Sequence, residues 1–82
     1  MDSFVYILEC ADGTLYTGWT TDIAARIETH NGGTGAKYTR GRGPVKLVYS
    51  EQHDSKSAAM RREAEIKKLS REGKLSLIGQ GH

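Results

Sequence analysis

The sequence predicts a single small α+β domain, and three observations lead to this fold class. Two runs rich in β-branched and aromatic residues, 4–10 and 14–18, flank an Asp-Gly pair, which is typical of a β-hairpin. Two later stretches, 20–31 and 54–71, carry capping residues and apolar residues at helical spacing. A further run at 45–49 alternates as a strand does. With 82 residues the chain forms one domain, 1–82, with a thin core.

Composition excludes several classes of protein. The single cysteine, Cys10, cannot form an internal disulfide, and with three scattered histidines it makes no structural zinc site. The start has neither a basic leader nor a long apolar run, so we expect a soluble, cytoplasmic protein with no membrane partner. The net charge of +2 is a weak indication of nucleic-acid binding, but cations gather locally at 36–46 and 60–74. Solvated surface faces are the alternative for both runs.

The register of the hairpin decides whether its two tyrosines can act together. A two-residue turn would place Tyr6 and Tyr16 on opposite faces of the sheet, because side chains alternate along a strand. A three-residue loop over 11–13, with Gly13 in the left-handed conformation of a bulge, would pair Tyr6 with Gly18 and put both phenols on one face. The Ala-Asp-Gly sequence suits that loop, since glycine supplies the positive φ.

The first helix is expected to run for about ten residues from a cap among 20–22. Ile23 and Ile27 mark its buried stripe, and Arg26 and His30, spaced i and i+4, lie at the edge of that stripe. A solvated arginine and a histidine that interacts with the helix dipole are the structural alternatives for these two residues.

Residues 32–43 form a glycine-rich, basic loop that cannot pack a core. Such a loop can bring backbone N–H groups and cations close to phosphates. It lacks the preceding strand and the Gly-Lys-Ser/Thr ending of a nucleotide P-loop, so that alternative is rejected. Lys37, Arg40 and Arg42 are the candidate phosphate contacts in this loop.

The second helix is expected to begin at a cap among 54–57, to run to about residue 71 and to stop at Gly73. The tail that follows is apolar enough at 74–78 to pack against the domain, whereas 79–82 is expected to fray.

Glu63 is an acidic residue on the apolar side of this second helix. The buried stripe is expected to contain Ala59, Met60, Ile66 and, less centrally, Leu69. Glu63 falls inside that arc on a helical wheel, whereas Glu65 points to solvent. An inward carboxylate needs a partner. An i, i+4 ion pair with a lysine, a buried pair with an arginine, and a metal or catalytic role all remain open from spacing alone.

Two phenols, an arginine, a histidine and an inward glutamate have a coherent joint chemistry. A single hard carboxylate can hold Mg²⁺ or Mn²⁺ when water and a substrate phosphate complete the octahedron. An arginine neutralises the charge that builds on the phosphoryl oxygens, and a phenol near a cation loses its proton more easily and can act as a base on water. This combination indicates phosphodiester hydrolysis, and it requires that Tyr6 and Tyr16 face the same side of the sheet as Arg26, His30 and Glu63.

The ordered motifs of the chain resemble those of the GIY-YIG nuclease superfamily, with its small stand-alone bacterial members the nearest in kind. The resemblance covers a core of about 4–71 and leaves a C-terminal tail at 74–82. The motifs that carry it are Val5-Tyr6-Ile7, Tyr16-Thr17-Gly18, Arg26-x-x-x-His30-Asn31, Gly35-Ala36-Lys37-x-Thr39, Gly43-Pro44 and Ala59-x-x-x-Glu63-x-x-Ile66-Lys67.

The resemblance implies a three-stranded antiparallel sheet flanked by helices, a divalent metal ion, and hydrolysis of DNA. It implies that Tyr6 and Tyr16 are the signature phenols, Arg26 the phosphate-stabilising arginine, His30 an assisting polar residue and Glu63 the metal ligand. Tyr6 is the phenol that we expect to activate water. The first motif lacks its glycine, and Thr17 stands in the middle of the second, but neither departure removes a chemical group.

The expected function is therefore a Mg²⁺- or Mn²⁺-dependent DNA endonuclease, structure-directed and used in DNA repair or processing. Branched and single-stranded DNA are the expected substrates. An 82-residue chain leaves no room for an additional targeting domain, so an unidentified protein partner is one source of target choice. A DNA-binding module with the same fold but no turnover, and a protein-interaction module with solvated basic faces, are the competing hypotheses.

Overall fold

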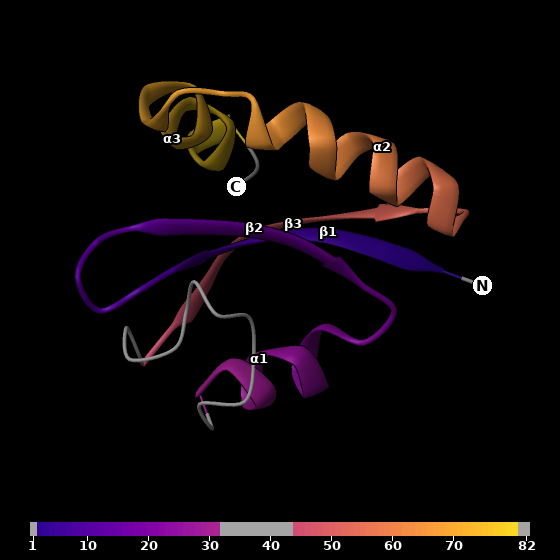
Figure 1. Ribbon diagram of the computed structural model, residues 1–82, viewed down its shortest axis with the longest axis horizontal. Coiled ribbons are helices and arrows are strands. Elements are labelled where there is room, and N and C mark those ends of the chain that lie inside the picture. Colours follow the sequence, from indigo (N-terminus) through magenta and orange to yellow (C-terminus); the bar gives the residue numbers. More distant parts are fainter. Residues whose placement is uncertain (1, 32–43, 81–82) are drawn as a thin grey trace.

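The computed structural model describes residues 2–31 and 44–80, and it confirms the α+β fold class. A three-stranded sheet lies between one helix on one face and two helices on the other (Figure 1). The elements in chain order are β1 (Ser3–Glu9), β2 (Leu15–Thr20), α1 (Ile23–Asn31), β3 (Lys46–His53), α2 (Lys56–Lys67) and α3 (Arg71–Gln80). Within the described ranges, every helix is too short or too polar to cross a membrane.

The N-terminal hairpin has the three-residue loop that the sequence predicts. The Cys10 N–H donates to the Thr14 carbonyl at 2.8 Å, and the Gly13 N–H donates to the Cys10 carbonyl at 2.9 Å. Gly13 has a φ of 86°, the left-handed conformation that a bulge requires. Tyr6 consequently pairs with Gly18, and the predicted register is confirmed.

The sheet is antiparallel in the order β2-β1-β3, so β1 is its central strand and β2 is an edge. The third strand is longer than the predicted 45–49 and continues to His53. A bulge interrupts its pairing with β1, since Ile7 pairs with Tyr49 but Leu8 pairs with Leu47. The alternation of apolar residues did not predict this extension, because Glu51 and His53, which face α2 there, form hydrogen bonds and are not apolar.

The core is divided between the two faces of the sheet. Under α2 and α3 lies a cluster of buried residues that comprises Val5, Ile7, Leu15, Tyr49, Ala59 and Ile66. On the α1 face the cluster is smaller and comprises Tyr6, Leu8, Cys10 and Val45, with Tyr16 and Ile27 packed against it. The two candidate phenols are therefore part of the thinner half of the core.

The first helix begins where its cap predicts. The Asp22 carboxylate accepts a hydrogen bond from the Ala25 N–H at 3.1 Å, so Asp22 caps α1. At the other end, the Asn31 side chain accepts a hydrogen bond from the Val45 N–H at 2.7 Å and donates to the Val45 carbonyl at 3.4 Å. This amide ties the end of α1 to the residue before β3.

The predicted end of the second helix is wrong. Helix α2 ends at Lys67, and a third helix begins at Arg71 and contains Gly73, the expected stop. The Ser70 hydroxyl accepts a hydrogen bond from the Gly73 N–H at 3.1 Å, and such a cap restarts a helix. The tail is thus helical through Gln80 rather than frayed from residue 79.

The buried stripe of the second helical region also differs in part from the prediction. Ala59 and Ile66 are fully buried as expected, but Met60 is 46% exposed and Leu69 is 40% exposed, so the predicted burial of these two residues is wrong. The apolar residues of α3 supply the missing cover, because Leu77 and Ile78 pack against the core under α2.

Candidate active site

The two hairpin tyrosines lie side by side on the face that α1 covers. Their ring centroids are 6.4 Å apart, and Tyr6 is 2% exposed. Gly18 lies opposite Tyr6, and a Cβ atom at this position would be 2.6 Å from the Tyr6 hydroxyl and 3.2 Å from Cε2 of Tyr16. A glycine at position 18 is therefore what allows the Tyr6 phenol to extend across β2.

His30 completes a group of three rings that meet in tilted and edge-to-face contacts. It occupies the last turn of α1, is 2% exposed, and places Nε2 at 3.3 Å from the Tyr6 hydroxyl oxygen. Its ring centroid is 5.2 Å from that of Tyr16. An interaction with the helix dipole, the structural alternative, does not by itself account for this residue, because its ring is buried against the two tyrosines.

Burial sets the protonation of this group. Burial, followed by the charges of Tyr16 and Glu63, raises the pKa of Tyr6 well above its ordinary value of 10.0, and the charge of Arg26 opposes the shift. Burial likewise raises the pKa of Tyr16. Burial and the charge of Arg26 lower the pKa of His30 from 6.5. At neutral pH both phenols are protonated and His30 is neutral. The charge of Arg26 lowers the pKa of both phenols, as expected of a nearby cation, but burial outweighs it.

Arg26 reaches the same group from the exposed side of α1. It lies one helical turn before His30, and its charge acts on the pKa of Tyr6, Tyr16 and His30 alike. The guanidinium is thus available at the solvent side of the rings, where an anionic substrate would approach.

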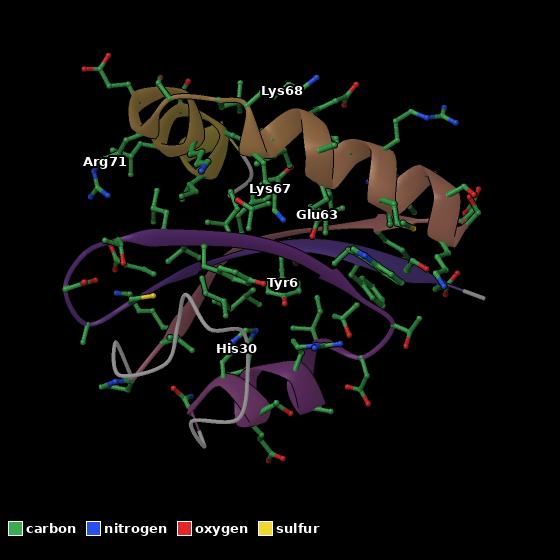
Figure 2. All side chains as sticks on the ribbon, in the orientation of Figure 1. Tyr6, His30, Glu63, Lys67, Lys68 and Arg71 are labelled. Atoms are coloured by element: carbon green, nitrogen blue, oxygen red, sulfur yellow. The ribbon has the colours of Figure 1, made fainter. Side chains whose placement is uncertain are left out.

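Glu63 comes from the other side of the sheet. Helix α2 covers the face opposite to α1, so the expectation that all five residues face one side is wrong for this residue. Figure 2 shows Glu63 pointing from α2 toward the sheet, with Tyr6 and His30 below it. Its charge raises the pKa of both Tyr6 and Tyr16. The carboxylate therefore acts on the two phenols across the edge strand β2.

Glu63 also makes the i, i+4 ion pair that its position in the helix allows. Its Oε2 lies 3.7 Å from Nζ of Lys67, and its side chain is only 19% exposed. Within 2–31 and 44–80, no three His, Cys, Asp or Glu side chains gather as a metal cage would require. A single, largely buried carboxylate whose charge acts on two phenols still suits a hard cation such as Mg²⁺, which binds one or two carboxylates and keeps several waters.

The predicted phosphate contacts Lys37, Arg40 and Arg42 lie outside the described residues. The sequence analysis instead overlooked the cations that follow Glu63. Lys67, Arg71 and Lys74 line two hollows against β2, at Thr14–Thr17. The local excess of positive charge in 60–74 was the available signal, but it did not show which of six cations face the sheet.

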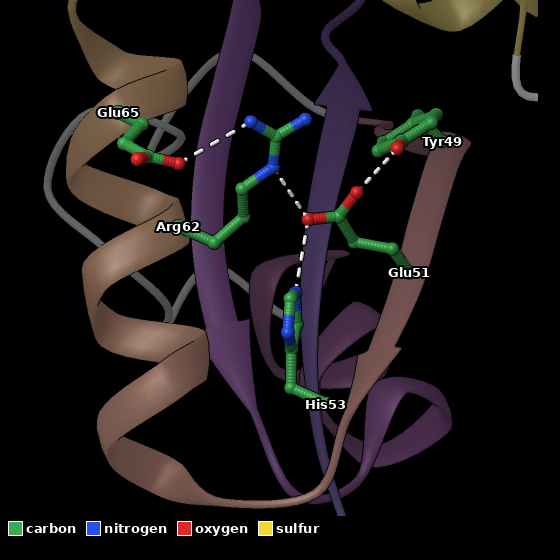
Figure 3. Close-up of polar contacts among 5 residues, drawn as sticks. All are labelled: Tyr49, Glu51, His53, Arg62 and Glu65. Carbon is green, nitrogen blue, oxygen red and sulfur yellow. Dashed lines mark hydrogen bonds and ion pairs between the residues drawn. The ribbon is translucent and has the colours of Figure 1, made fainter.

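A second polar cluster lies on the α2 face and holds the helix to the sheet (Figure 3). The Glu51 carboxylate accepts hydrogen bonds from the Tyr49 hydroxyl at 2.5 Å and from Arg62 Nε at 2.8 Å, and it contacts His53 Nε2 at 3.0 Å. Burial favours a higher pKa for Glu51, but these hydrogen bonds and the Arg62 charge outweigh it and lower the pKa. The cluster is remote from the three rings and is a structural link between α2 and β3.

Comparison with known proteins identifies the family. A model of the GIY-YIG catalytic domain matches residues 2–76. A UPF0213 protein of Natronomonas pharaonis is 61% identical over 94% of this chain and 91% of its own, and one of Streptococcus agalactiae is 59% identical over 95% and 89%. The relatives thus contain little beyond this domain.

Two solved structures share the fold. The solution NMR structure of a UPF0213 protein from Bacillus halodurans has a TM-score of 0.64 at 55% identity, covering 98% of this chain and 85% of that one. The solution NMR structure of a protein from E. faecalis has a TM-score of 0.65 at 39% identity, covering 100% and 91%. The resemblance seen in the sequence motifs is confirmed, and the chain belongs to the GIY-YIG nuclease family, alongside small UPF0213 proteins of bacteria and archaea.

Proposed function

We propose that the protein is a divalent-metal-dependent endonuclease that hydrolyses phosphodiester bonds of branched or single-stranded DNA during repair or processing. One observation carries the proposal: Tyr6, Tyr16 and His30 are in ring contact at the edge of the sheet, where the charges of Arg26 and Glu63 also act. Family membership supports the reaction class.

Glu63 would hold the Mg²⁺ or Mn²⁺ ion. When bound, the ion supplies Lewis-acid polarisation of the phosphoryl group and neutralises charge on the leaving oxygen. Metal binding requires Glu63 to leave its ion pair with Lys67. The pair is long, with 3.7 Å between Lys67 Nζ and Glu63 Oε2, and the lysine side chain is half exposed, so the pair competes only weakly with a metal ion.

His30 and Tyr6 together form the route for the proton of the attacking water. The neutral imidazole can accept at Nε2 the hydrogen that the Tyr6 hydroxyl carries, while the phenol oxygen takes a proton from water. The hydroxide attacks phosphorus and the bond to the leaving oxygen breaks. This transfer leaves no free phenolate, which suits the raised pKa of Tyr6.

Tyr16 and Arg26 stabilise charge in this scheme. Tyr16 keeps its proton because burial raises its pKa, so its hydroxyl can donate to a phosphate oxygen. Arg26 lies on the exposed side of α1, and its guanidinium can pair with the non-bridging oxygens as charge develops.

A DNA-binding module without turnover is the second candidate function. The observation that favours it is the ion pair between Glu63 and Lys67, because a carboxylate retained by a lysine would bind metal poorly. The two functions differ in whether DNA is cut, since both require binding.

The decisive experiment compares Glu63→Gln with Glu65→Gln. Both variants remove one carboxylate from α2, but the Glu65 side chain is 60% exposed and contacts Arg62 instead of the rings. Supercoiled, single-stranded and branched DNA are incubated with each protein in Mg²⁺, in Mn²⁺ and in EDTA. We expect cleavage by the wild type and Glu65→Gln, and its loss in Glu63→Gln, in Arg26→Ala and in EDTA.

A readout other than cleavage tests the metal site separately. Mn²⁺ should raise the unfolding temperature of the wild type and of Glu65→Gln, but not of Glu63→Gln, because a ligand that binds only the folded state stabilises it. Cleavage that persists in Glu63→Gln would overturn the metal assignment. Salt-sensitive DNA binding with no cleavage under any condition would favour the binding module.

A further inference from the structure

Two hollows adjoin each other along the outer edge of β2. One, of about 180 Å³, is lined by Thr14, Leu15, Arg71 and Lys74. The other, of about 270 Å³, is lined by Leu15, Tyr16, Thr17, Lys67 and Lys74. They share Leu15 and Lys74, so they form a single path that begins at the candidate catalytic residue Tyr16 and leads toward the hairpin loop.

The charged residues along this path are all cations. Lys67, Arg71 and Lys74 come from the end of α2 and the start of α3, and no acidic side chain lines either hollow among the described residues. Two carboxylates contact residues of this lining: Asp12 accepts hydrogen bonds from Thr14 at the hairpin end, and Glu63, of the candidate active site, pairs with Lys67. The break after Lys67 turns Arg71 and Lys74 toward β2, next to Lys67 at the end of α2.

Arg71 is held in place by the hairpin. Its Nη1 donates a hydrogen bond to the Gly13 carbonyl at 2.7 Å, and Figure 2 shows its side chain directed to the hairpin end of the sheet. A guanidinium carries five N–H donors, so this bond leaves donors for an anion. A cation whose side chain is already ordered loses less entropy when it binds a phosphate.

The length of the path suits a nucleic-acid strand. Residues 14–17 of an extended strand span about 10 Å, and a DNA strand in a duplex has one phosphate per about 3.4 Å of axis. We propose that the DNA strand leaves the active site along the outer edge of β2, with Lys67, Arg71 and Lys74 contacting its phosphates. This inference rests on the proposed nuclease function and gives it a direction for the substrate strand.

The test measures binding without cleavage. Affinity of a fluorescent DNA duplex with a single-stranded extension is measured by anisotropy in EDTA between 50 and 200 mM salt. Each phosphate contact contributes about 0.9 to the slope of log K against log salt on duplex DNA, which is about 3.5-fold in affinity over this fourfold range. Lys74→Ala and Arg71→Ala should each reduce the loss of DNA affinity between 50 and 200 mM salt by about that factor.

Lys68→Ala is the matched control. Lys68 follows Lys67 directly and carries the same charge, but Figure 2 shows it pointing away from the sheet. Its slope should stay at the wild-type value. Lys67 is left unchanged because its loss would also alter Glu63. Unfolding temperatures confirm that each variant is folded, and Lys74→Gln replaces Lys74→Ala if the shorter side chain destabilises α3.

The outcomes separate this inference from the proposed function. Wild-type binding with equal slopes for the Lys74, Arg71 and Lys68 variants would overturn the β2 path and leave the nuclease proposal standing. Absence of any salt-dependent DNA affinity in the wild type would overturn both. Lower slopes for the Lys74 and Arg71 variants alone would support the path.

Discussion

Replacing Gly18 by alanine tests the geometry of the candidate site most directly. The added Cβ would lie 2.6 Å from the Tyr6 hydroxyl, 2.8 Å from Cζ of the same ring and 3.2 Å from Cε2 of Tyr16. Gly18 pairs with Tyr6 across β1 and β2, so the backbone cannot move away without breaking the register. The phenol must therefore shift.

The size of the shift follows from these distances. To reach ordinary contact at 3.4 Å, the hydroxyl must move by about 0.8 Å from its present 2.6 Å. Tyr6 is 2% exposed, so the ring has little free space, and overpacking of this kind costs about 1–3 kcal/mol of stability. A comparable displacement lengthens the 3.3 Å contact with His30, and misplacement by about 1 Å can reduce a rate by about 100-fold.

The assay pairs thermal unfolding with cleavage of labelled DNA, and Gly79→Ala is the control. A Cβ at Gly79 meets no atom within 4 Å, so this variant should gain up to about 1 kcal/mol of helix stability with wild-type activity. Gly18→Ala should be less stable and should cleave about 10- to 100-fold more slowly while still binding DNA. Wild-type cleavage by Gly18→Ala would refute the role of the Tyr6 position.

Four further substitutions, with Tyr49→Phe as a control, test the protonation and packing arguments. Tyr6→Phe should reduce the rate of cleavage by about 10²–10⁴-fold with little loss of stability. Tyr49→Phe, on the opposite face of the sheet, should leave cleavage intact. Equal effects of the two variants on cleavage would contradict the proton route through His30. His30 has a lowered pKa, so the unfolded chain binds the proton more tightly, and stability present above about pH 6.5 is lost as the pH falls through the folded pKa. Chemical denaturation should show this loss in the wild type and a flatter profile in His30→Gln. Glu51→Gln should lower the free energy of unfolding by about 1–3 kcal/mol at pH 7, because it weakens the hydrogen bonds that hold α2 to the sheet. The folded variant should still cleave DNA. An unchanged denaturation midpoint would count against this link. Thr17→Val should raise the free energy of unfolding by about 1 kcal/mol, because the buried Thr17 hydroxyl has no hydrogen-bond partner among the described residues. A lower denaturation midpoint would show that the hydroxyl has a partner.

The hairpin could be predicted from the sequence because its determinants are local. The Ala-Asp-Gly loop fixes the register through one glycine with positive φ, and the register decides on which face Tyr6 and Tyr16 lie. The cap of α1 at Asp22 is local in the same sense. Family motifs then supplied the role of Arg26, which no local rule distinguishes from a surface arginine. They also supplied the role of Glu63, for which periodicity predicted only an inward direction.

The errors arise where tertiary contacts override local signals. Gly73 reads as a stop, but the Ser70 cap and the packing of Leu77 and Ile78 make that region a helix. Helical periodicity predicted that Glu63 points inward, but it could not show that α2 covers the face opposite to α1. It likewise could not show that the break after Lys67 turns the next cations toward β2, because that depends on how α3 packs.

The edge position of β2 explains how helices on opposite faces can serve one site. The central strand β1 has a neighbouring strand on each side, whereas β2 has one on a single side, so side chains from α1 and α2 can approach each other around its open edge. Gly18 contributes to this approach, because the Tyr6 ring occupies the space that a side chain at position 18 would fill. The same ring is part of the smaller core, so Tyr6→Ala would remove packing together with the hydroxyl. Tyr6→Phe is therefore the substitution that isolates the chemistry, and a larger loss of stability in Tyr6→Ala than in Tyr6→Phe would measure how far this domain builds its core from its active site.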